Sequence, residues 1–452
     1  KKNGMKRRCC YIESLFLAGI ICLSACGSKN PGVSKEELKK EFVKGRTQKD
    51  SPVEESAPSE FAEDYQAPPG IKYQPRIMTE GAIVLNVESA LKNVRPFRLS
   101  DLGKEVNYKK MEPRCDGSSL IRIDDDFLVF AEDGLWLLDR DFEKKKMLVR
   151  SDLKVIHSGG GSVKVEGGYF LRDFYYDSAK EQLRFTCQNM KTGKAHLVVT
   201  PWAELLASPQ PVELKSIRSK LPIDRNYLFS MPDGYGMRVS CSDELYTMGL
   251  KGDTLCHFVL GDNERYKARL FEAEGDIVYY YQGNTMFYHA YGGKIYRIKN
   301  ASTLEVAYKL DFGSLPHLTG ARVVGGADVG NSYFLTSCVD TDRFLFLSID
   351  KGYDSINARK NRSVKLYSLV YDKRSGEFFS LPVVSDKVNP EQPLIIADLP
   401  ESLPFWPNRS IEGNPARFFS KSSLLELYPA QMRENGQVEK LSEADNIWLI
   451  IK

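Results

Sequence analysis

The side chains most able to hold a metal or to transfer protons are spread thinly along this chain. No HExxH motif occurs and no two histidines are four residues apart, so the chain offers no pair of zinc ligands on one helix face. For each histidine, a surface or hydrogen-bonded core position is the favoured interpretation, and we predict neither a metal site nor a cofactor. The five histidines are His157, His196, His257, His289 and His317.

Clusters of aspartate and glycine have the composition of turns. Three successive aspartates at 124–126 lead directly into FLVF and lack the glycine and the distal glutamate of a calcium loop. Segments 340–342 and 372–376 have the residues of hairpin turns. The glycines at 159–161 precede no Lys-Ser/Thr pair, so we predict a flexible connection there. No GxSxG motif is present, and the sequence therefore singles out no nucleophile or catalytic residue.

The nine cysteines divide between the N-terminus and the rest of the chain. Their wide spacing beyond residue 26 excludes a CxxC metal site, and most lie in apolar runs, where a thiol packs as a small hydrophobic group. Buried free thiols are favoured, and one disulfide between Cys241 and Cys256 is the alternative. The cysteines beyond residue 26 are Cys115, Cys187, Cys241, Cys256 and Cys338.

The N-terminus has the pattern of an export signal. Lys6, Arg7 and Arg8 precede an apolar stretch, 15–23, that is too short for a permanent membrane span. It ends in Leu-Ser-Ala-Cys, which resembles a bacterial lipobox, where small residues precede the cleavage site and the cysteine carries diacylglycerol. We therefore predict a lipoprotein signal peptide over 1–25 and a lipid on Cys26 that anchors the protein to a membrane.

A spacer and a nearly neutral domain follow the predicted lipid. Residues 51–75 are rich in Pro, Glu, Ser and Ala, a composition that stays extended and solvated, and we assign 26–79 to the lipidated cysteine and a flexible spacer. Removal of residues 1–25, with five Lys/Arg and one Glu, changes the net charge from +3 to −1. A chain of this charge lacks the basic field that phosphate recognition needs, so nucleic acid is not an expected partner.

From residue 80 onward the chain consists of short β-branched and aromatic runs separated by Gly, Asp and Asn. A chain of 452 residues exceeds what one ordinary core supports, and four-stranded units stacked around an axis avoid that limit. We predict an all-β fold, with a six-bladed β-propeller over 80–452 whose sixth unit is assembled from the C-terminal region. Five outer hairpins are predicted at 135–149, 183–199, 244–260, 294–313 and 364–381, each preceded by inner strands.

The two ends of this domain carry apolar strands. These are GAIVLNV at 81–87 and NIWLIIK at 446–452. In a closed ring a terminal strand completes a blade begun at the other terminus. We predict that these two segments meet.

Several segments together resemble the six-bladed β-propeller lipoproteins of Bacteroidetes, a family whose function is largely uncharacterised. The resemblance rests on IVLNVESALKNVRPFRLSDLGKEVNYKKME (83–112), KIYRIKNASTLEVAYKLDFG (294–313), PFWP (404–407) and ADNIWLIIK (444–452). It implies an outer-membrane lipoprotein. Residues 27–30 carry no acid, whereas lipoproteins sent to the outer surface in this group often do, so the periplasmic face is favoured.

One departure from the family concerns the segment before PFWP. The family usually has Asp-Gly-Gly there, whereas Pro400, Glu401 and Ser402 follow Asp398 in this chain. Phe405 and Trp406 lie between prolines and are predicted on a loop, where they form a candidate binding loop with Asp398. The favoured alternative is that Trp406 packs as a plug between two blades.

Two functional hypotheses from different classes stay open. The first is a non-catalytic binding or scaffolding lipoprotein that presents the propeller to a glycan, a peptide or an envelope protein, and the lack of a catalytic motif favours it. The second is a propeller hydrolase or lyase acting on an extracellular polymer or a lactone. Converging Asp, Asn, Glu and His side chains at the axis would favour the second hypothesis.

Overall fold

The computed structural model describes the chain from residue 71 onward with gaps, within a single compact unit, Pro69–Lys452. The predicted signal peptide, Cys26 and the spacer up to residue 70 lie outside the described residues and stay predictions. Within the described part no helix has the length and apolar character needed to cross a membrane. The described ranges are 71–112, 120–131, 133–151, 155–158, 162–165, 168–189, 195–214, 221–223, 228–231, 233–238, 244–260, 277–289, 293–317, 332–351, 365–382, 393–420 and 446–452.

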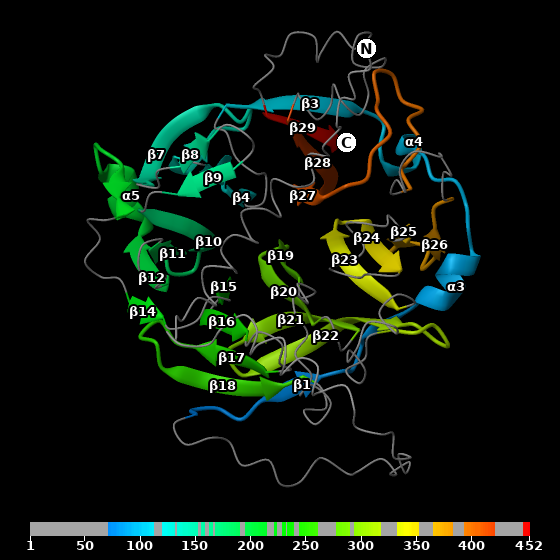
Figure 1. Ribbon diagram of the computed structural model, residues 1–452, viewed down its shortest axis with the longest axis horizontal. Helices are drawn as coiled ribbons and strands as arrows, with labels where there is room; N and C mark the ends of the chain where they lie inside the picture. Colours follow the sequence, from blue (N-terminus) through cyan, green and yellow to red (C-terminus); the bar gives the residue numbers. More distant parts are fainter. Residues whose placement is uncertain are drawn as a thin grey trace, which may run out of the picture. The chain divides into compact units, whose positions relative to one another are not determined.

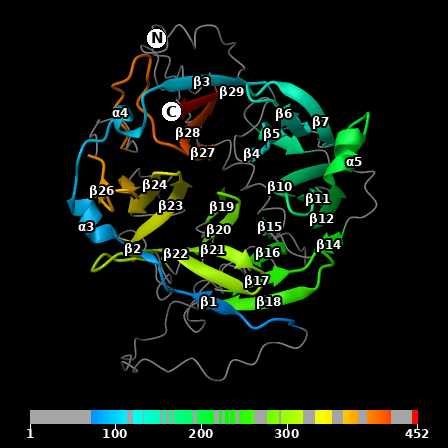
Figure 2. The same ribbon diagram turned by 180° about the vertical axis from the view of Figure 1, so that it is seen from behind.

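Six sheets, each built on antiparallel strands, surround a common axis as the blades of a β-propeller (Figures 1 and 2). Blade 1 contains β4 (Leu120–Ile123), β5 (Asp126–Ala131), β6 (Gly134–Leu138) and β7 (Lys144–Arg150), with β13 (Val212–Glu213) parallel to β7. Blade 2 contains β10 (Tyr169–Asp177), β11 (Gln182–Asn189), β12 (Ala195–Pro201) and β14 (Leu221–Ile223). Blade 3 contains β15 (Leu228–Met231), β16 (Gly234–Arg238), β17 (Glu244–Met248) and β18 (Thr254–Val259).

The other three blades complete the ring. Blade 4 contains β19 (Ile277–Tyr281), β20 (Asn284–His289), β21 (Lys294–Asn300) and β22 (Thr303–Asp311). Blade 5 contains β23 (Tyr333–Asp340), β24 (Phe344–Lys351), β25 (Lys365–Asp372) and β26 (Phe378–Ser380). Blade 6 contains β27 (Arg409–Ile411), β28 (Asn414–Ser420), β29 (Asn446–Ile451) and, at its outer edge, β3 (Val106–Met111). A separate hairpin joins β8 (Val155–Ser158) to β9 (Ser162–Val165), and α5 (Trp202–Ala207) follows β12.

The predicted all-β fold and its six blades are confirmed, and all five predicted outer hairpins occur as paired strands. The reason is visible in β22, whose residues alternate between buried and part-exposed positions as a strand packed on one face requires. The turns predicted at 124–126, 340–342 and 372–376 are confirmed, since residues 124–125, 341–343 and 373–377 connect consecutive strands.

Residues 71–111, which we call the belt, run along the outer edges of four blades (Figure 1, blue to cyan). The amides of Lys72 and Tyr73 donate to the carbonyl of Leu255 on β18. Next, β1 (Arg76–Met78) and β2 (Ile83–Asn86) pair in parallel with β22. After α3 (Val87–Lys92), the belt bridges to blade 5 and, through α4 (Leu99–Leu102), continues into β3.

The predicted pairing of the two terminal apolar strands is wrong. The C-terminal strand β29 pairs antiparallel with β3, from Asn446 opposite Met111 to Ile451 opposite Val106. The segment 83–86 instead lies parallel to β22 on blade 4. The ring is therefore closed by a strand that begins about twenty residues later than predicted, because the belt must first pass blades 4 and 5.

Most apolar clusters lie between neighbouring blades. One cluster fills the space between blades 5 and 6, and others lie between blades 1 and 2, 3 and 4, 4 and 5, and 6 and 1. Between blades 2 and 3 the cluster of buried apolar residues is small, and a fully buried arginine, Arg184, donates to the carbonyl of Met231 and pairs with Asp177. Several moderate cores thus replace one oversized core.

Candidate functional site

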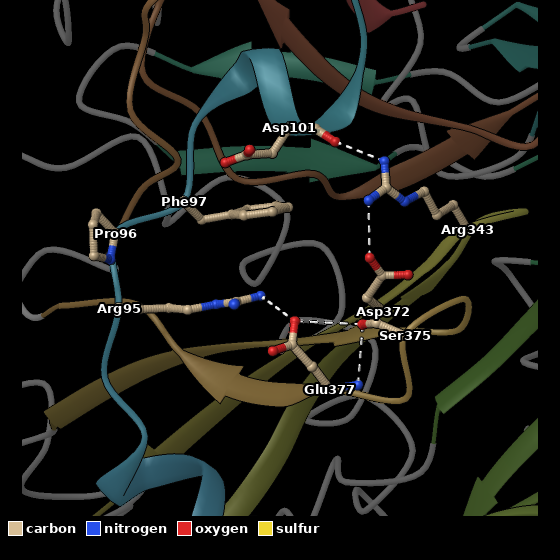
Figure 3. Close-up of a pocket in the computed structure, with 8 residues that line it drawn as sticks. All are labelled: Arg95, Pro96, Phe97, Asp101, Arg343, Asp372, Ser375 and Glu377. Carbon is tan, nitrogen blue, oxygen red and sulfur yellow. Dashed lines mark hydrogen bonds and ion pairs between the residues drawn. The ribbon is translucent and has the colours of Figure 1, made fainter.

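A recess of about 390 Å³ lies at the rim of blade 5, where the belt crosses two of its turns (Figure 3). Its volume falls within the range of small-molecule sites. One wall comes from the belt and the other from the β23–β24 and β25–β26 turns with the end of β25. The lining residues are Arg95, Pro96, Phe97, Asp101, Arg343, Asp372, Ser375 and Glu377.

Backbone pairing and ring stacking position Arg95 in the belt wall. Its amide donates to the carbonyl of Ser380 at 3.0 Å, which ties this part of the belt to β26. Its guanidinium lies 3.6 Å from the centre of the Phe379 ring, and its Nη2 is 3.1 Å from Glu377 Oε2. Figure 3 shows the guanidinium reaching across the recess to that carboxylate.

Arg343 stands in the opposite wall and is held more firmly. Its Nη1 donates to the carbonyl of Asp101 at 3.0 Å, and its Nη2 donates to Asp372 Oδ2 at 2.9 Å. The guanidinium also lies 4.5 Å from the centre of the Phe344 ring. One arginine therefore links the belt to two turns of blade 5, and the planar fork of its donors is fixed in orientation.

Each of the three carboxylates among the lining residues accepts a hydrogen bond or forms an ion pair. Asp101 Oδ2 accepts from the Arg98 amide at 2.9 Å, and Glu377 accepts from Ser375 Oγ as well as pairing with Arg95. Burial opposes ionisation of Asp372, but hydrogen bonds from Arg343 and from the Arg374 amide outweigh it and hold the pKa of this carboxyl below its usual value. Asp372 is thus a fixed anionic acceptor near neutral pH and is poorly suited to donate a proton.

A buried ion pair supports the turn that carries Ser375 and Glu377. Lys373 contacts Asp340 and the carbonyl of Thr341, and its Nζ is 3.1 Å from the hydroxyl of Tyr281 in blade 4. Burial raises the pKa of Asp340, although Lys373 acts in the opposite direction. Because both charges are largely removed from water and joined to several partners, this turn has little freedom to move.

The residues of the candidate binding loop, Asp398, Phe405 and Trp406, do not line the recess. Phe405 is fully buried and Trp406 is 3% exposed, inside the apolar cluster between blades 5 and 6. The Trp406 Nε1 donates to Ser348 Oγ at 2.9 Å, and its ring meets Phe346 edge-on at 5.4 Å. The structure thus places Trp406 as a plug between blades, the favoured alternative. The ring has no exposed face with which to bind a ligand, so this motif does not form a binding platform.

Asp398 joins the belt to the loop before PFWP. It accepts hydrogen bonds from the amide and the hydroxyl of Ser100, at 3.0 and 2.6 Å, in the first turn of α4. The Ser100 hydroxyl, in spite of partial desolvation, is the main reason that the pKa of Asp398 is lowered. Glu401, three residues after Asp398, has a φ of +56°, so a residue with a side chain adopts a left-handed backbone in the segment where the sequence resemblance leads one to expect glycine. These contacts give Asp398 a positioning role at the belt.

The described histidines and cysteines do not converge. Among the residues that the structure describes, no group of three or more His, Cys, Asp and Glu is arranged to hold a metal ion. His317 stacks on Phe312 at 3.8 Å, and burial lowers its pKa to about 4. The described cysteines Cys187, Cys256 and Cys338 are free and buried, as favoured from the sequence, whereas Cys241, the other half of the alternative disulfide, lies outside the described residues.

The residues of the recess could not be identified from the sequence. Arg95, Arg343 and Glu377 come from segments that are far apart in sequence, and none belongs to a spaced motif. The available signal was limited to turn composition at 372–376, which predicts the turn but not the charged wall that it forms with the belt.

The fold and its site define a six-bladed β-propeller with a charged recess at its rim. The chain belongs to the family described as a domain of unknown function, DUF4933, whose model matches residues 68–430. No curated protein matches the chain.

Solved structures with propeller-like similarity are distant. A protein of unknown function from Bacteroides caccae is 12% identical, over 57% of this chain and 77% of that one, with a TM-score of 0.28. Regucalcin, a calcium-binding protein from Agrobacterium tumefaciens, is 13% identical, over 64% of this chain and 95% of that one, with a TM-score of 0.28. Both TM-scores are below 0.5, so neither neighbour carries an argument about this chain's ligand.

Proposed function

We propose that the protein is a cell-envelope lipoprotein whose propeller is a non-catalytic binding or scaffolding module for a glycan, a peptide or an envelope protein. The lipid on Cys26 anchors it to the outer membrane, with the domain on the periplasmic side. The observation that carries the binding role is the recess between the belt and blade 5, in which charged donors and acceptors are fixed at a solvent-open surface.

The electrostatics of the recess support binding rather than catalysis. A general acid or base needs a pKa near the working pH, whereas Asp372 is held ionised by Arg343. Glu377 and Asp101 likewise serve as acceptors for neighbouring groups. Polar groups that are held in place before a ligand arrives, as Arg343 is, suit recognition because they lose little entropy when the ligand is bound.

The binding role is tested by capture from an envelope extract. The Cys26→Ala chain is immobilised and compared with the same chain carrying Arg95→Ala, and bound material is identified by mass spectrometry. We expect a component that the first chain retains and the second loses. Equal retention by both chains would contradict a role for the recess, and release of soluble products from an envelope polymer would favour the hydrolase or lyase hypothesis.

The anchor has its own test. We expect Cys26→Ala to move the protein from the detergent phase to the aqueous phase in phase partitioning, because in this proposal the lipid provides the membrane affinity. The melting temperature of the domain should stay unchanged. An alanine variant that still enters the detergent phase would refute the lipoprotein assignment.

A further inference from the structure

The recess at the rim of blade 5 presents two ion pairs with accessible edges. In the first pair the Arg95 and Glu377 side chains are 38% and 54% exposed. In the second, Arg343 is 38% exposed while Asp372 is only 9% exposed. The first pair therefore offers guanidinium N–H donors and a carboxylate acceptor, whereas the second offers the donors of Arg343 alone, because both oxygens of the nearly buried Asp372 already accept hydrogen bonds.

The balance of charge in the recess disfavours a charged ligand. Two guanidinium groups face the carboxylates of Asp372 and Glu377, so these charges balance, while the Asp101 carboxylate points away from Arg343 (Figure 3) and accepts from the Arg98 amide. An anion would have to compete with these carboxylates for the guanidinium donors. A cation would find each carboxylate already hydrogen-bonded or ion-paired, and would have to displace an existing partner.

A hydroxyl group fits this arrangement because it donates and accepts at once. A hydroxyl beside an arginine–carboxylate pair accepts from the guanidinium and donates to the carboxylate without breaking the pair. Two neighbouring hydroxyls of a sugar ring can contact the guanidinium and the carboxylate of one ion pair at the same time. Ser375 Oγ adds a further donor and acceptor beside Glu377. Pro96, which is exposed, supplies the apolar part of the lining that the C–H face of such a ring would contact, while Phe97 is buried beneath it against Phe344 and Phe379.

We propose that this recess binds a neutral sugar residue of a glycan, with Arg343, held by Asp372, as the rigid donor and with Arg95 and Glu377 as the adaptable donor–acceptor pair. The proposal rests on the binding function proposed above and narrows its ligand to the neutral polyhydroxylated class. Arg343 is fixed at Asp101, Asp372 and Phe344, so its donors are already oriented before a sugar arrives. The Arg95–Glu377 pair is exposed, and exposed pairs rearrange at low cost.

The test uses the Cys26→Ala chain and ligand-observed NMR with a panel of neutral sugars: glucose, galactose, mannose, N-acetylglucosamine and their β-linked disaccharides. Glucuronate, glucosamine and inorganic phosphate are the charged comparisons. We expect saturation transfer to at least one neutral sugar and weaker transfer to the charged compounds. Glu377→Ala should weaken that binding about tenfold, the effect of losing one hydrogen bond to a charged group, with an unchanged melting temperature.

Glu80→Ala is the matched control, because Glu80 is an exposed belt carboxylate outside the recess, and it should leave sugar binding unchanged. Absence of transfer to every neutral sugar, preference for an anion, or equal binding by Glu377→Ala would each overturn the proposal. Failure here is distinguishable from failure of the broader function. If an envelope component is captured through the recess while no neutral sugar binds, the binding function stands and the sugar assignment falls.

Discussion

At the scale of single residues, Trp406 shows how a polar atom is accommodated inside an apolar cluster. The indole is buried between blades 5 and 6, and its one donor reaches Ser348 on β24. A buried tryptophan without a partner for its N–H would lose the energy of that hydrogen bond. The residue therefore joins two blades both by packing and by a directed contact.

We expect Trp406→Ala to lower the free energy of unfolding by about 3–5 kcal/mol, as truncation of large buried aromatic residues does. Trp406→Phe retains much of the packing but leaves Ser348 without this donor, and should cost less. Denaturant unfolding followed by circular dichroism measures both, with Val94→Ala as an exposed apolar control. A loss below about 1 kcal/mol for Trp406→Ala would contradict the plug.

His317 makes stability depend on pH. Burial holds its folded-state pKa at about 4, below the ordinary value of 6.5. Between these pH values the unfolded chain binds a proton that the folded chain does not, so stability falls as the pH is lowered from 6.5 towards 4. At pH 5 this amounts to about 2 kcal/mol relative to pH 8.

The measurement compares the unfolding free energy of the natural chain with that of His317→Phe at pH 8 and pH 5. The variant keeps an aromatic ring beside Phe312 but cannot titrate. Burial raises the pKa of Asp350 to about 6, which changes the pH dependence of stability in the opposite direction. Because Asp350 is present in both proteins, its contribution cancels in the comparison. If the unfolding free energies of the two proteins depended on pH in the same way, His317 would not have the lowered pKa on which this prediction rests.

At the scale of elements, the short helix α4 depends on a residue from a distant loop. Its first turn receives the carboxylate of Asp398, nearly 300 residues later in the chain, which bonds the Ser100 amide and hydroxyl. A four-residue helix has too few internal hydrogen bonds to be stable alone. The loop before PFWP thus fixes the belt where it leaves blade 5 for blade 6.

Asp398→Ala should therefore lower stability by about 1–2 kcal/mol, the usual effect of losing a side-chain cap. Asp398→Asn keeps an acceptor and should lose less. Thermal unfolding measures the loss of stability in both variants, with Glu80→Ala as an exposed acidic control. Equal melting temperatures for Asp398→Ala and the natural chain would show that α4 does not need this cap.

Local pattern explains which elements the sequence could predict. The hairpins follow from alternation such as that of β22 and from turn residues at 372–376, where Gly376 has a φ of +75°. The closing strand could not be found in this way. The segment 83–86 is more apolar than β3, which contains two lysines, yet β3 is the partner of β29 because the belt's path around blades 4 and 5 decides its position. The recess was unpredictable for the same reason, since Arg95 and Arg343 meet only after the ring has formed.

At the scale of the whole molecule, ring closure joins the C-terminal strand β29 to β3, the last part of the belt. Every residue of β29 is buried, and the strand lies between β28 and β3. Without it, blade 6 would expose the edges of both neighbours and the apolar clusters on either side.

Deletion of 446–452 should consequently abolish cooperative unfolding or prevent soluble expression, whereas deletion of 28–65 should leave the melting temperature unchanged. Calorimetry of both truncated chains measures the difference. Equal stability of the two would refute ring closure by β29.

The belt also determines how the propeller would carry mechanical load from an N-terminal anchor. Its attachments are arranged in series: two hydrogen bonds at Leu255, then β1 and β2 on β22, then the bridges at Ser380 and Ile396, and finally β3 on β29. A pulling force that enters at residue 71 meets the two hydrogen bonds at Leu255 first and reaches the closing strand last. Tension would thus be absorbed by peeling of the belt, and blade 6 would be protected until all earlier attachments had been released.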